Sequence, residues 1–227
     1  MTIRICVSIL PKTVDEALKL VKRAEKYEPD FIEVRLDSIN DTSKLAAIAK
    51  CTKIPLIATN RAKDCGGVFS GSEEERQQIL YEASKKGFEY VDIELSVAGL
   101  KNIVENFRRL GVKPIISFHD FEKTPPLRII EDIFKEQVEN GAEVCKIVTT
   151  AKSLEDNLTL LNFLNEASKS AKVICFAMGP LGKISRLLSP VFGGFFTIAS
   201  LERNLETAPG QMTIQKLREF YRTLGVT

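Results

Sequence analysis

Hydrophobic positions along the chain follow two patterns that alternate from one end to the other. Eight short runs rich in β-branched and aromatic residues predict strands, at residues 3–9, 31–36, 54–59, 90–95, 112–118, 143–149, 172–177 and 194–199. Apolar residues with helical spacing lie between them, most clearly at residues 13–27, 72–87, 125–141 and 153–170. Ser72 and Ser153 stand before acidic first turns, and Gly87, Gly111 and Gly141 follow helical segments as stop signals.

Strict alternation of strands and helices predicts a parallel sheet, because parallel neighbours need a crossover connection. Eight such units in 227 residues predict an α/β fold of the (β/α)8 TIM barrel type, a parallel eight-stranded barrel with outer helices. A doubly wound open sheet is the alternative, but it normally has a glycine-rich turn after its first strand, and "SILPKTVDE" has none. Since no linker or low-complexity stretch interrupts the pattern, residues 1–227 are expected to form a single (β/α)8 domain.

Side chains two residues apart along a strand share a face, and this rule assigns several polar residues to the barrel interior. In "FIEVRLD", Ile32 and Val34 belong to the apolar set that faces the helices, so Glu33 and Arg35 point inward. Ser8 points inward from the first strand by the same rule. These polar residues lie in the second halves of their strands, toward the end of a TIM barrel that carries the chemistry.

Lys146 is the inward residue with the most distinctive chemistry. It lies in the middle of "GAEVCKIVTTAKS", which otherwise has the composition of a buried strand. An unpaired ammonium in that position is expected to lose its proton, and a neutral amine in a dry pocket attacks ketones to form a Schiff base. The alternatives are an edge residue, for which a closed ring of strands has no place, or half of a buried ion pair, for which Glu33 is a candidate partner.

His119 is the only histidine of the chain. Its ordinary pKa suits proton transfer near neutral pH, so it is a candidate general acid and base, although a histidine near a loop is most often a satisfied polar residue. Arg35, Arg61 and Arg186 are either solvated surface charges or forks for a carboxylate or phosphate at the barrel mouth. Residues 201–217, "LERNLETAPGQMTIQKL", are either a plain connection or a lid over that mouth.

The composition argues against several classes of protein, including nucleic-acid-binding and membrane proteins. With 44% hydrophobic and 27% charged residues and a formal charge of +2, the chain is ordinarily globular and lacks the basic run typical of nucleic-acid binding. No apolar run approaches the ~18 residues of a membrane span, and the first residues lack a signal-peptide layout, so a cytoplasmic protein without a membrane partner is expected. Five scattered cysteines indicate reduced thiols, and a single histidine argues against a multi-histidine metal centre.

Seven short motifs, in order along nearly the whole chain, resemble type I 3-dehydroquinate dehydratase, a lyase of the shikimate pathway. They are "VS" at Ser8, "EVRLD" at Glu33 and Arg35, "TNRAK" at Arg61, "SFHDF" at His119, "CKIV" at Lys146, "ISRL" at Arg186 and "APGQ" at Gln211. Each motif is weak alone, and their shared order makes the resemblance specific. It implies a (β/α)8 barrel, a homodimer, and catalysis without a metal ion or organic cofactor.

The resemblance also implies a reaction and a role for each residue. Lys146 would form an iminium with the C3 ketone of 3-dehydroquinate. His119 would remove the C2 proton and return it to the departing C1 hydroxyl, while Glu33 orients the imidazole. Arg186 would clamp the substrate carboxylate, and the products would be 3-dehydroshikimate and water. Substrate hydroxyls and the closed lid would be held by Ser8, Arg35, Arg61, Thr207 and Gln211.

The chain departs from the family pattern at two places. Thr207 stands where relatives often have serine, a change that keeps the hydroxyl. After Arg61 relatives often have a lid glutamate, whereas this chain has "KDCGG", which leaves Asp64 or Cys65 near that position. The substrate contact made there is therefore open.

Two other functions compete with the dehydratase. A class I aldolase would also place a Schiff-base lysine on a barrel strand, and it would use "GPLGK" and "VFGGFF" as a sugar-phosphate pocket. A noncatalytic barrel would bind small carboxylates, with Lys146 as a charged contact. Turnover of 3-dehydroquinate against phosphorylated sugars separates the two enzymes, and borohydride trapping at Lys146 separates an enzyme from a binding protein.

Overall fold

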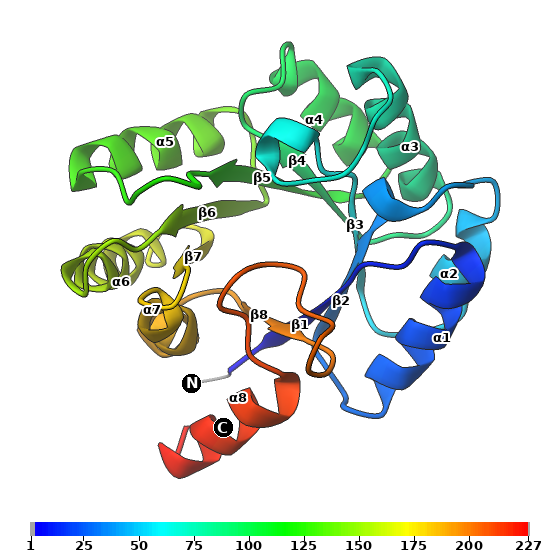
Figure 1. Cartoon of the computed structure of the whole chain (residues 1–227). Coiled ribbons are helices and arrows are strands. Elements are labelled where there is room, and N and C mark those ends of the chain that lie inside the picture. Colours follow the sequence, from blue (N-terminus) through cyan, green and yellow to red (C-terminus); the bar gives the residue numbers. More distant parts are fainter. Residues whose placement is uncertain (1–2, 227) are drawn as a thin grey trace.

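The computed structural model describes residues 3–226, in which strands and helices alternate (Figure 1). The strands are β1 (Ile5–Ile9), β2 (Phe31–Arg35), β3 (Leu56–Thr59), β4 (Tyr90–Glu94), β5 (Lys113–His119), β6 (Val144–Thr150), β7 (Lys172–Met178) and β8 (Thr197–Ser200). The helices are α1 (Val14–Glu25), α2 (Leu45–Lys50), α3 (Glu73–Lys85), α4 (Leu100–Arg109), α5 (Leu127–Glu139), α6 (Glu155–Ala167), α7 (Lys183–Leu188) and α8 (Ile214–Thr223). Short 3-10 turns are η1 (Leu36–Ser38), η2 (Lys63–Cys65) and η3 (Ser189–Phe192).

The strands form one parallel sheet in the order β7-β6-β5-β4-β3-β2-β1-β8, with the helices around its outside (Figure 1). The predicted TIM barrel is therefore confirmed, and the predicted strand ends agree with the structure within two residues except at the start of β8. The ring is nearly closed. In the described residues β7 and β8 share no ladder, and the seam is bridged where Phe195 N donates to Val173 O at 2.7 Å.

Two glycines before β8 explain this seam. The hydrophobic pattern predicts a strand over residues 194–199, but β8 begins at Thr197. Gly193 has a φ of 93° at the end of η3, and Gly194 N donates to Ser189 O at 2.9 Å. Because this backbone is used in a turn, only four residues are left to form β8.

Local signals set several helix ends. Ser72 and Glu75 form a capping box at α3, in which Glu75 N donates to Ser72 Oγ and Ser72 N donates to Glu75 Oε2. The expected cap at Ser153 is not made, since α6 begins at Glu155 without a side-chain cap. Ser153 N instead donates to Asp156 Oδ2 at 3.0 Å. The predicted glycine stops have φ values of 109°, 78° and 83° at Gly87, Gly111 and Gly141.

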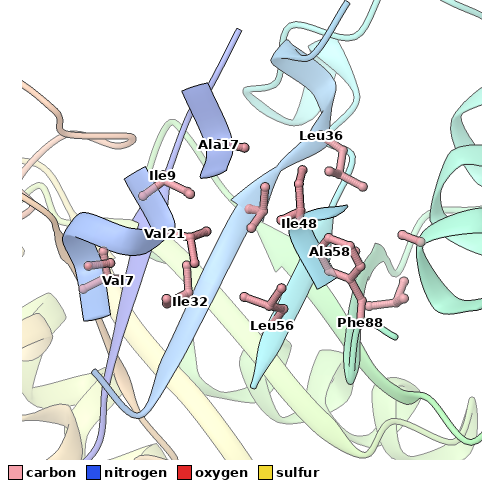
Figure 2. Packing of buried hydrophobic residues seen from close by; sticks show 14 of the residues in the cluster. Val7, Ile9, Ala17, Val21, Ile32, Leu36, Ile48, Leu56, Ala58 and Phe88 are labelled. Carbon is pink, nitrogen blue, oxygen red and sulfur yellow. The ribbon is translucent and has the colours of Figure 1, made fainter. Parts of the chain in front are cut away.

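Alternation along the strands divides the core into two apolar layers. One layer packs strands against helices, and Figure 2 shows the part of it in which Val7 and Ile32 face Val21 of α1. The other layer lies inside the barrel, where Phe31 and Tyr90 occupy the N-terminal end and Val148 and Phe176 extend it to the cavity wall. The polar inward residues at the C-terminal ends of the strands therefore lie next to apolar side chains of the barrel interior.

The structure also bears on two expectations from the composition, which concern membrane spans and cysteine pairing. Within residues 3–226, no helix combines the length and the apolar character that crossing a bilayer requires. All five cysteines are free, and Cys6, Cys145 and Cys175 are buried.

Candidate active site

A cavity opens at the C-terminal ends of the strands, the end of the barrel where chemistry is predicted. The loop between β8 and α8, orange to red in Figure 1, contributes residues at its mouth. All predicted site residues except Ser8 line this one cavity. Its charged and polar side chains are Glu33, Arg35, Arg61, Cys65, His119, Lys146, Arg186, Thr207 and Gln211, and its apolar side chains are Phe121, Val148, Phe176, Met178, Ile198, Ala208 and Pro209.

Lys146 points into the barrel from the middle of β6 and is buried. Its Nζ lies 2.7 Å from Asp92 Oδ2 and 3.6 Å from Glu33 Oε1. The expectation of an unpaired, neutral amine is therefore wrong, because Lys146 forms a buried ion pair with two carboxylates. Glu33, the partner named in the ion-pair alternative, is one of them. Strand alternation places the lysine but not its partner, since Asp92 lies 54 residues away in the chain.

Asp92 is the carboxylate around which the ion pairs of the site are arranged. Its Oδ2 faces Lys146, while its Oδ1 accepts a hydrogen bond from Ser117 Oγ at 2.7 Å and pairs with Arg61 NH2 at 2.6 Å. Arg61 NH1 donates to Ser117 Oγ at 2.8 Å and to Glu94 Oε1 at 3.0 Å. Arg61, predicted as a fork for a bound anion, is thus already held by two carboxylates of the protein.

The charge state of Asp92 follows from this arrangement. Burial raises the pKa of its carboxyl, but the positive charges of Arg61 and Lys146 outweigh burial. The pKa of Asp92 therefore lies well below its ordinary value, and the group is an anion at neutral pH.

Asp92 and Glu94 are two buried carboxylates that the sequence reasoning missed. Both lie in "YVDIE", where Val91 and Ile93 belong to the apolar layer that faces the helices. The alternation that assigns Glu33 to the barrel interior would have assigned these two residues to it as well.

His119 lies at the end of β5, and its ring stacks on Phe121 with the ring centroids 5.9 Å apart. Its Nδ1 is buried and has no hydrogen-bond partner among residues 3–226. Burial, together with the positive charges of Arg61 and Lys146, holds the pKa of His119 well below its ordinary value. The imidazole is therefore neutral at neutral pH and can accept a proton.

Glu33 does not make the contact that the resemblance implies. In the described part of the chain no hydrogen bond joins Glu33 to His119. Instead, Glu33 Oε1 accepts a hydrogen bond from Thr59 Oγ1 at 2.8 Å and lies 3.6 Å from Lys146 Nζ. Burial raises the pKa of Glu33, but the nearby positive charge of Lys146 and other contacts lower it further, so Glu33 is a charged partner of the lysine.

Arg35 is held by a carboxylate two residues away. Its Nε and NH2 donate to the two oxygens of Asp37 at 2.7 and 2.6 Å. The same pair fastens the loop after β3, because Arg35 NH2 lies 3.5 Å from Gly66 O and Val68 N donates to Asp37 Oδ2 at 3.1 Å. Arg35 therefore anchors one wall of the cavity that it also lines.

Arg186 differs from the other arginines of the cavity, because no carboxylate pairs with it in the described residues. It is 1% exposed, its Nε has no hydrogen-bond partner, and its NH1 donates to Ile198 O at 3.4 Å. Its Cζ lies 4.2 Å from the centroid of the Phe176 ring. Burial lowers the pKa of Arg186 to about 10, so it is a cation without a counter-ion at neutral pH. Such a group is suited to bind an anion.

The loop between β8 and α8 is held over the cavity by bonds within it and by close packing. Thr207 N donates to Gln211 Oε1 at 2.8 Å, and Gln211 Nε2 donates to Thr207 Oγ1 at 2.9 Å. Gly210 has a φ of 81°, and a Cβ there would lie 2.7 Å from Gly179 O in the loop after β7. The loop therefore contributes Thr207, Ala208, Pro209 and Gln211 to the lining of the cavity.

The structure also gives the locations of Cys65, Asp64 and Ser8, which the sequence analysis named as candidate site residues. Cys65 is half-buried and lines the cavity, whereas Asp64 is exposed and does not. Ser8 is buried on β1, and its Oγ has no hydrogen-bond partner among the described residues. Among residues 3–226, no group of three or more His, Cys, Asp and Glu side chains is placed to hold a metal ion.

The glycines of "VFGGFF" lie at the opposite end of the barrel from the cavity. Gly193 and Gly194 precede β8, and the next residue, Phe195, bonds to Val173 near the start of β7. Ligand phosphates in TIM barrels bind at the other face. These glycines therefore give no support to a sugar-phosphate pocket.

Known proteins match this chain over nearly its whole length. A family model described as type I 3-dehydroquinase matches residues 5–227. A 3-dehydroquinate dehydratase of Methanococcus maripaludis is 37% identical over 217 residues, which cover 95% of this chain and 97% of the relative. The 3-dehydroquinate dehydratase structure from Geobacillus kaustophilus matches with a TM-score of 0.92 and 26% identity, over 99% of this chain and 92% of that one.

A second solved structure is the type I 3-dehydroquinate dehydratase of Clostridium difficile, described as containing covalently modified comenic acid. It matches with a TM-score of 0.86 and 28% identity, over 97% of this chain and 91% of that one. Fold, motif order and sequence identity thus agree. The chain belongs to the type I 3-dehydroquinase family, the enzymes that dehydrate 3-dehydroquinate in the shikimate pathway.

Proposed function

We propose that the chain dehydrates 3-dehydroquinate through a Schiff base on Lys146, with His119 as general acid and base. The observation that carries this proposal is that both side chains line the same cavity at the C-terminal end of the barrel. The reaction needs a nucleophile for a ketone and a group that moves protons, and these two residues supply them. The covalently modified comenic acid of the Clostridium difficile relative is consistent with covalent chemistry.

The reaction begins with the ammonium of Lys146. The neutral imidazole of His119 takes one proton from the ammonium, the amine forms a bond to C3, and the imidazolium gives that proton to the C3 oxygen. A second proton passes from the nitrogen to the same oxygen, the bond from C3 to that oxygen breaks, and water leaves an iminium that keeps one hydrogen on nitrogen. The iminium draws electrons from C2, whose proton passes to His119. The C1–O bond then breaks, and His119 protonates the leaving hydroxyl. Hydrolysis of the iminium releases 3-dehydroshikimate and restores the lysine.

Arg186 is the residue that we propose for the substrate carboxylate. Arg35 and Arg61 already hold carboxylates of the protein, whereas Arg186 lacks one among the described residues. A guanidinium fork fits a carboxylate with two parallel hydrogen bonds. Binding there would also give the buried cation a counter-ion.

Two predicted residues act in this proposal through other residues of the site. Glu33 stabilises the positive charge of Lys146 instead of orienting His119, because its carboxylate lies beside the amine. Arg61 positions Asp92 and does not bind substrate through a free fork. The homodimer and the cytoplasmic location stay predictions, as do substrate or lid contacts by Ser8, Arg35, Thr207 and Gln211.

Reduction with sodium borohydride in the presence of 3-dehydroquinate tests the proposed function. Peptide mass spectrometry is expected to find a reduced ligand adduct on Lys146, together with irreversible loss of activity, and borohydride without substrate serves as the control. Dehydration without any adduct, or an adduct on another lysine, would contradict the proposal. Binding without adduct or turnover would favour the noncatalytic barrel, and turnover of phosphorylated sugars alone would favour the aldolase.

Arg186→Met is expected to lower kcat/KM on the order of 10²- to 10³-fold, because the substrate carboxylate loses its charged partner. The same change removes a buried cation that lacks a counter-ion, so the free energy of unfolding is expected to rise. Steady-state kinetics and urea unfolding measure the two effects. Arg35→Met is the matched control and should lower the free energy of unfolding, because it leaves Asp37 without its partner. Unchanged kcat/KM in Arg186→Met would rule out the clamp.

A further inference from the structure

Asp92 makes a contact that the reaction described above does not use. Its Oδ2 lies 2.7 Å from Lys146 Nζ, which is a hydrogen-bond distance. The second carboxylate, Glu33, lies 3.6 Å from that nitrogen, and the same oxygen accepts a hydrogen bond from Thr59. Asp92 is therefore the carboxylate that fixes the direction of an N–H bond on the amine.

The orientation of Asp92 is set by groups other than the lysine. Its Oδ1 accepts a hydrogen bond from Ser117 Oγ at 2.7 Å and pairs with Arg61 NH2 at 2.6 Å. Ser117 is opposite Lys146 in the pairing of β5 with β6, and Arg61 is itself fixed by Glu94 at 3.0 Å. Because both donors hold Oδ1, Oδ2 is presented to the lysine by the framework of the barrel.

The fate of the lysine hydrogens shows what this contact can do. An ammonium carries three hydrogens. When an ammonium and a ketone become an iminium and water, the C–O double bond breaks, a C–N double bond forms, and two of the hydrogens leave in the water. The third hydrogen and the positive charge stay on nitrogen. Atoms and charge therefore balance without any change in Asp92.

We propose that Asp92 is the counter-ion of the Schiff base and accepts a hydrogen bond from the N–H that remains on the nitrogen. This inference rests on the proposed function of Lys146. Asp92 pairs with the ammonium before the reaction and with the iminium after it. It keeps the Schiff base protonated, and a protonated imine withdraws electrons from C2 far better than a neutral one. Because Asp92 holds one N–H, the other two hydrogens of the lysine nitrogen are directed toward the cavity, where the ketone binds.

Other groups contribute to the charge around this nitrogen. Glu33 is the second nearby anion, and it is retained when Asp92 is changed, so part of the stabilisation should survive. Besides Asp92 of β4, the titratable groups near Lys146 are Glu33 of β2, Cys6 of β1 and His119 of β5. The other charged or titratable residues that line the same cavity are Arg35, Arg61, Cys65 and Arg186.

Asp92→Asn tests the proposal, because it keeps the shape of the side chain and removes its charge. An anion raises the pKa of an adjacent cation, so its removal lowers the pKa of the iminium. The alkaline limb of the kcat profile is therefore expected to move down by about 1–3 pH units. Trapping with cyanoborohydride, which reduces iminium ions in preference to neutral imines, should lose yield over the same pH range.

Glu94→Gln is the matched control, since Glu94 belongs to the same buried network through Arg61 but does not contact Lys146. The alkaline limb of the kcat profile of Glu94→Gln is expected at the same pH as in the wild type, even if the variant has a lower free energy of unfolding. Suppose that the borohydride adduct forms in the wild type. An alkaline limb that does not move in Asp92→Asn, or that moves equally in Glu94→Gln, would then overturn the role of Asp92. A missing wild-type adduct would instead overturn the Schiff-base function itself.

Ser117→Ala gives a second test in case Asp92→Asn does not fold. It keeps both charges and removes a hydrogen bond that orients the Asp92 carboxylate. A smaller shift of the alkaline limb in the same direction is expected. No shift in a folded Ser117→Ala protein would overturn the proposal.

Discussion

Lys146→Met is expected to lower kcat on the order of 10⁵-fold or more, because the variant loses the amine that is held in place to attack the bound ketone. Methionine keeps most of the length and apolar packing of the lysine stem. No borohydride adduct should form with 3-dehydroquinate. The ultraviolet absorbance of the conjugated product, followed with purified variant, measures the residual rate.

Lys172→Met is the matched control for this substitution. Lys172 is also a strand lysine, but it lies at the start of β7, pairs with Glu143 and sits 5.5 Å from the centroid of the Phe195 ring. Its kcat is expected to equal that of the wild type. Assays of Lys146→Met need a temperature well below its thermal midpoint, because Glu33 loses its cation. A kcat within about tenfold of wild type in that variant would exclude the lysine as nucleophile.

His119→Ala is expected to lower kcat by about 10²- to 10⁴-fold, the usual contribution of a positioned general acid and base. The borohydride adduct on Lys146 should still form, more slowly, because the lysine itself is intact. This combination separates the two residues, since Lys146→Met loses the adduct and His119→Ala keeps it. Rapid-quench trapping over time measures adduct formation independently of turnover.

The pH dependence gives a sharper test of His119. A general base works only when deprotonated, and the pKa of His119 is held below its ordinary value by burial and the charges of Arg61 and Lys146. The base form therefore persists to lower pH, and the acid limb of kcat/KM is expected below pH ~6.5 in the wild type. In His119→Ala this limb should disappear. A limb that persists unchanged in the variant belongs to another group.

The charges of the site explain how one cavity holds a charged lysine beside a neutral histidine. The carboxylates of Asp92 and Glu33 stand next to the lysine, so its positive charge is compensated. His119 has no hydrogen-bonded carboxylate at Nδ1 among the described residues, and burial, together with nearby cations, opposes its protonation. Two groups with different environments can therefore serve as nucleophile and as proton carrier at the same pH.

The sequence by itself determined the alternation of elements, the TIM barrel and the inward direction of the site residues. These properties follow from local rules, because hydrophobic spacing distinguishes strand from helix and a strand presents alternate residues to the same side. Glu33, Arg35 and Lys146 were placed correctly for that reason. The same rule would have placed Asp92, whose neighbours Val91 and Ile93 face the helices.

Only the tertiary structure decided which of the inward charges meet. Lys146 and Asp92 are 54 residues apart, and Arg61 and Ser117 are 56 apart, so their contacts depend on strand stagger and on the course of the loops. The hydrophobic pattern that locates the strands in the sequence determines neither the strand stagger nor the course of the loops. Burial alone therefore suggested an unpaired amine at Lys146, whereas the assembled barrel supplies it with carboxylates and leaves Arg186 as the buried cation suited to an incoming anion.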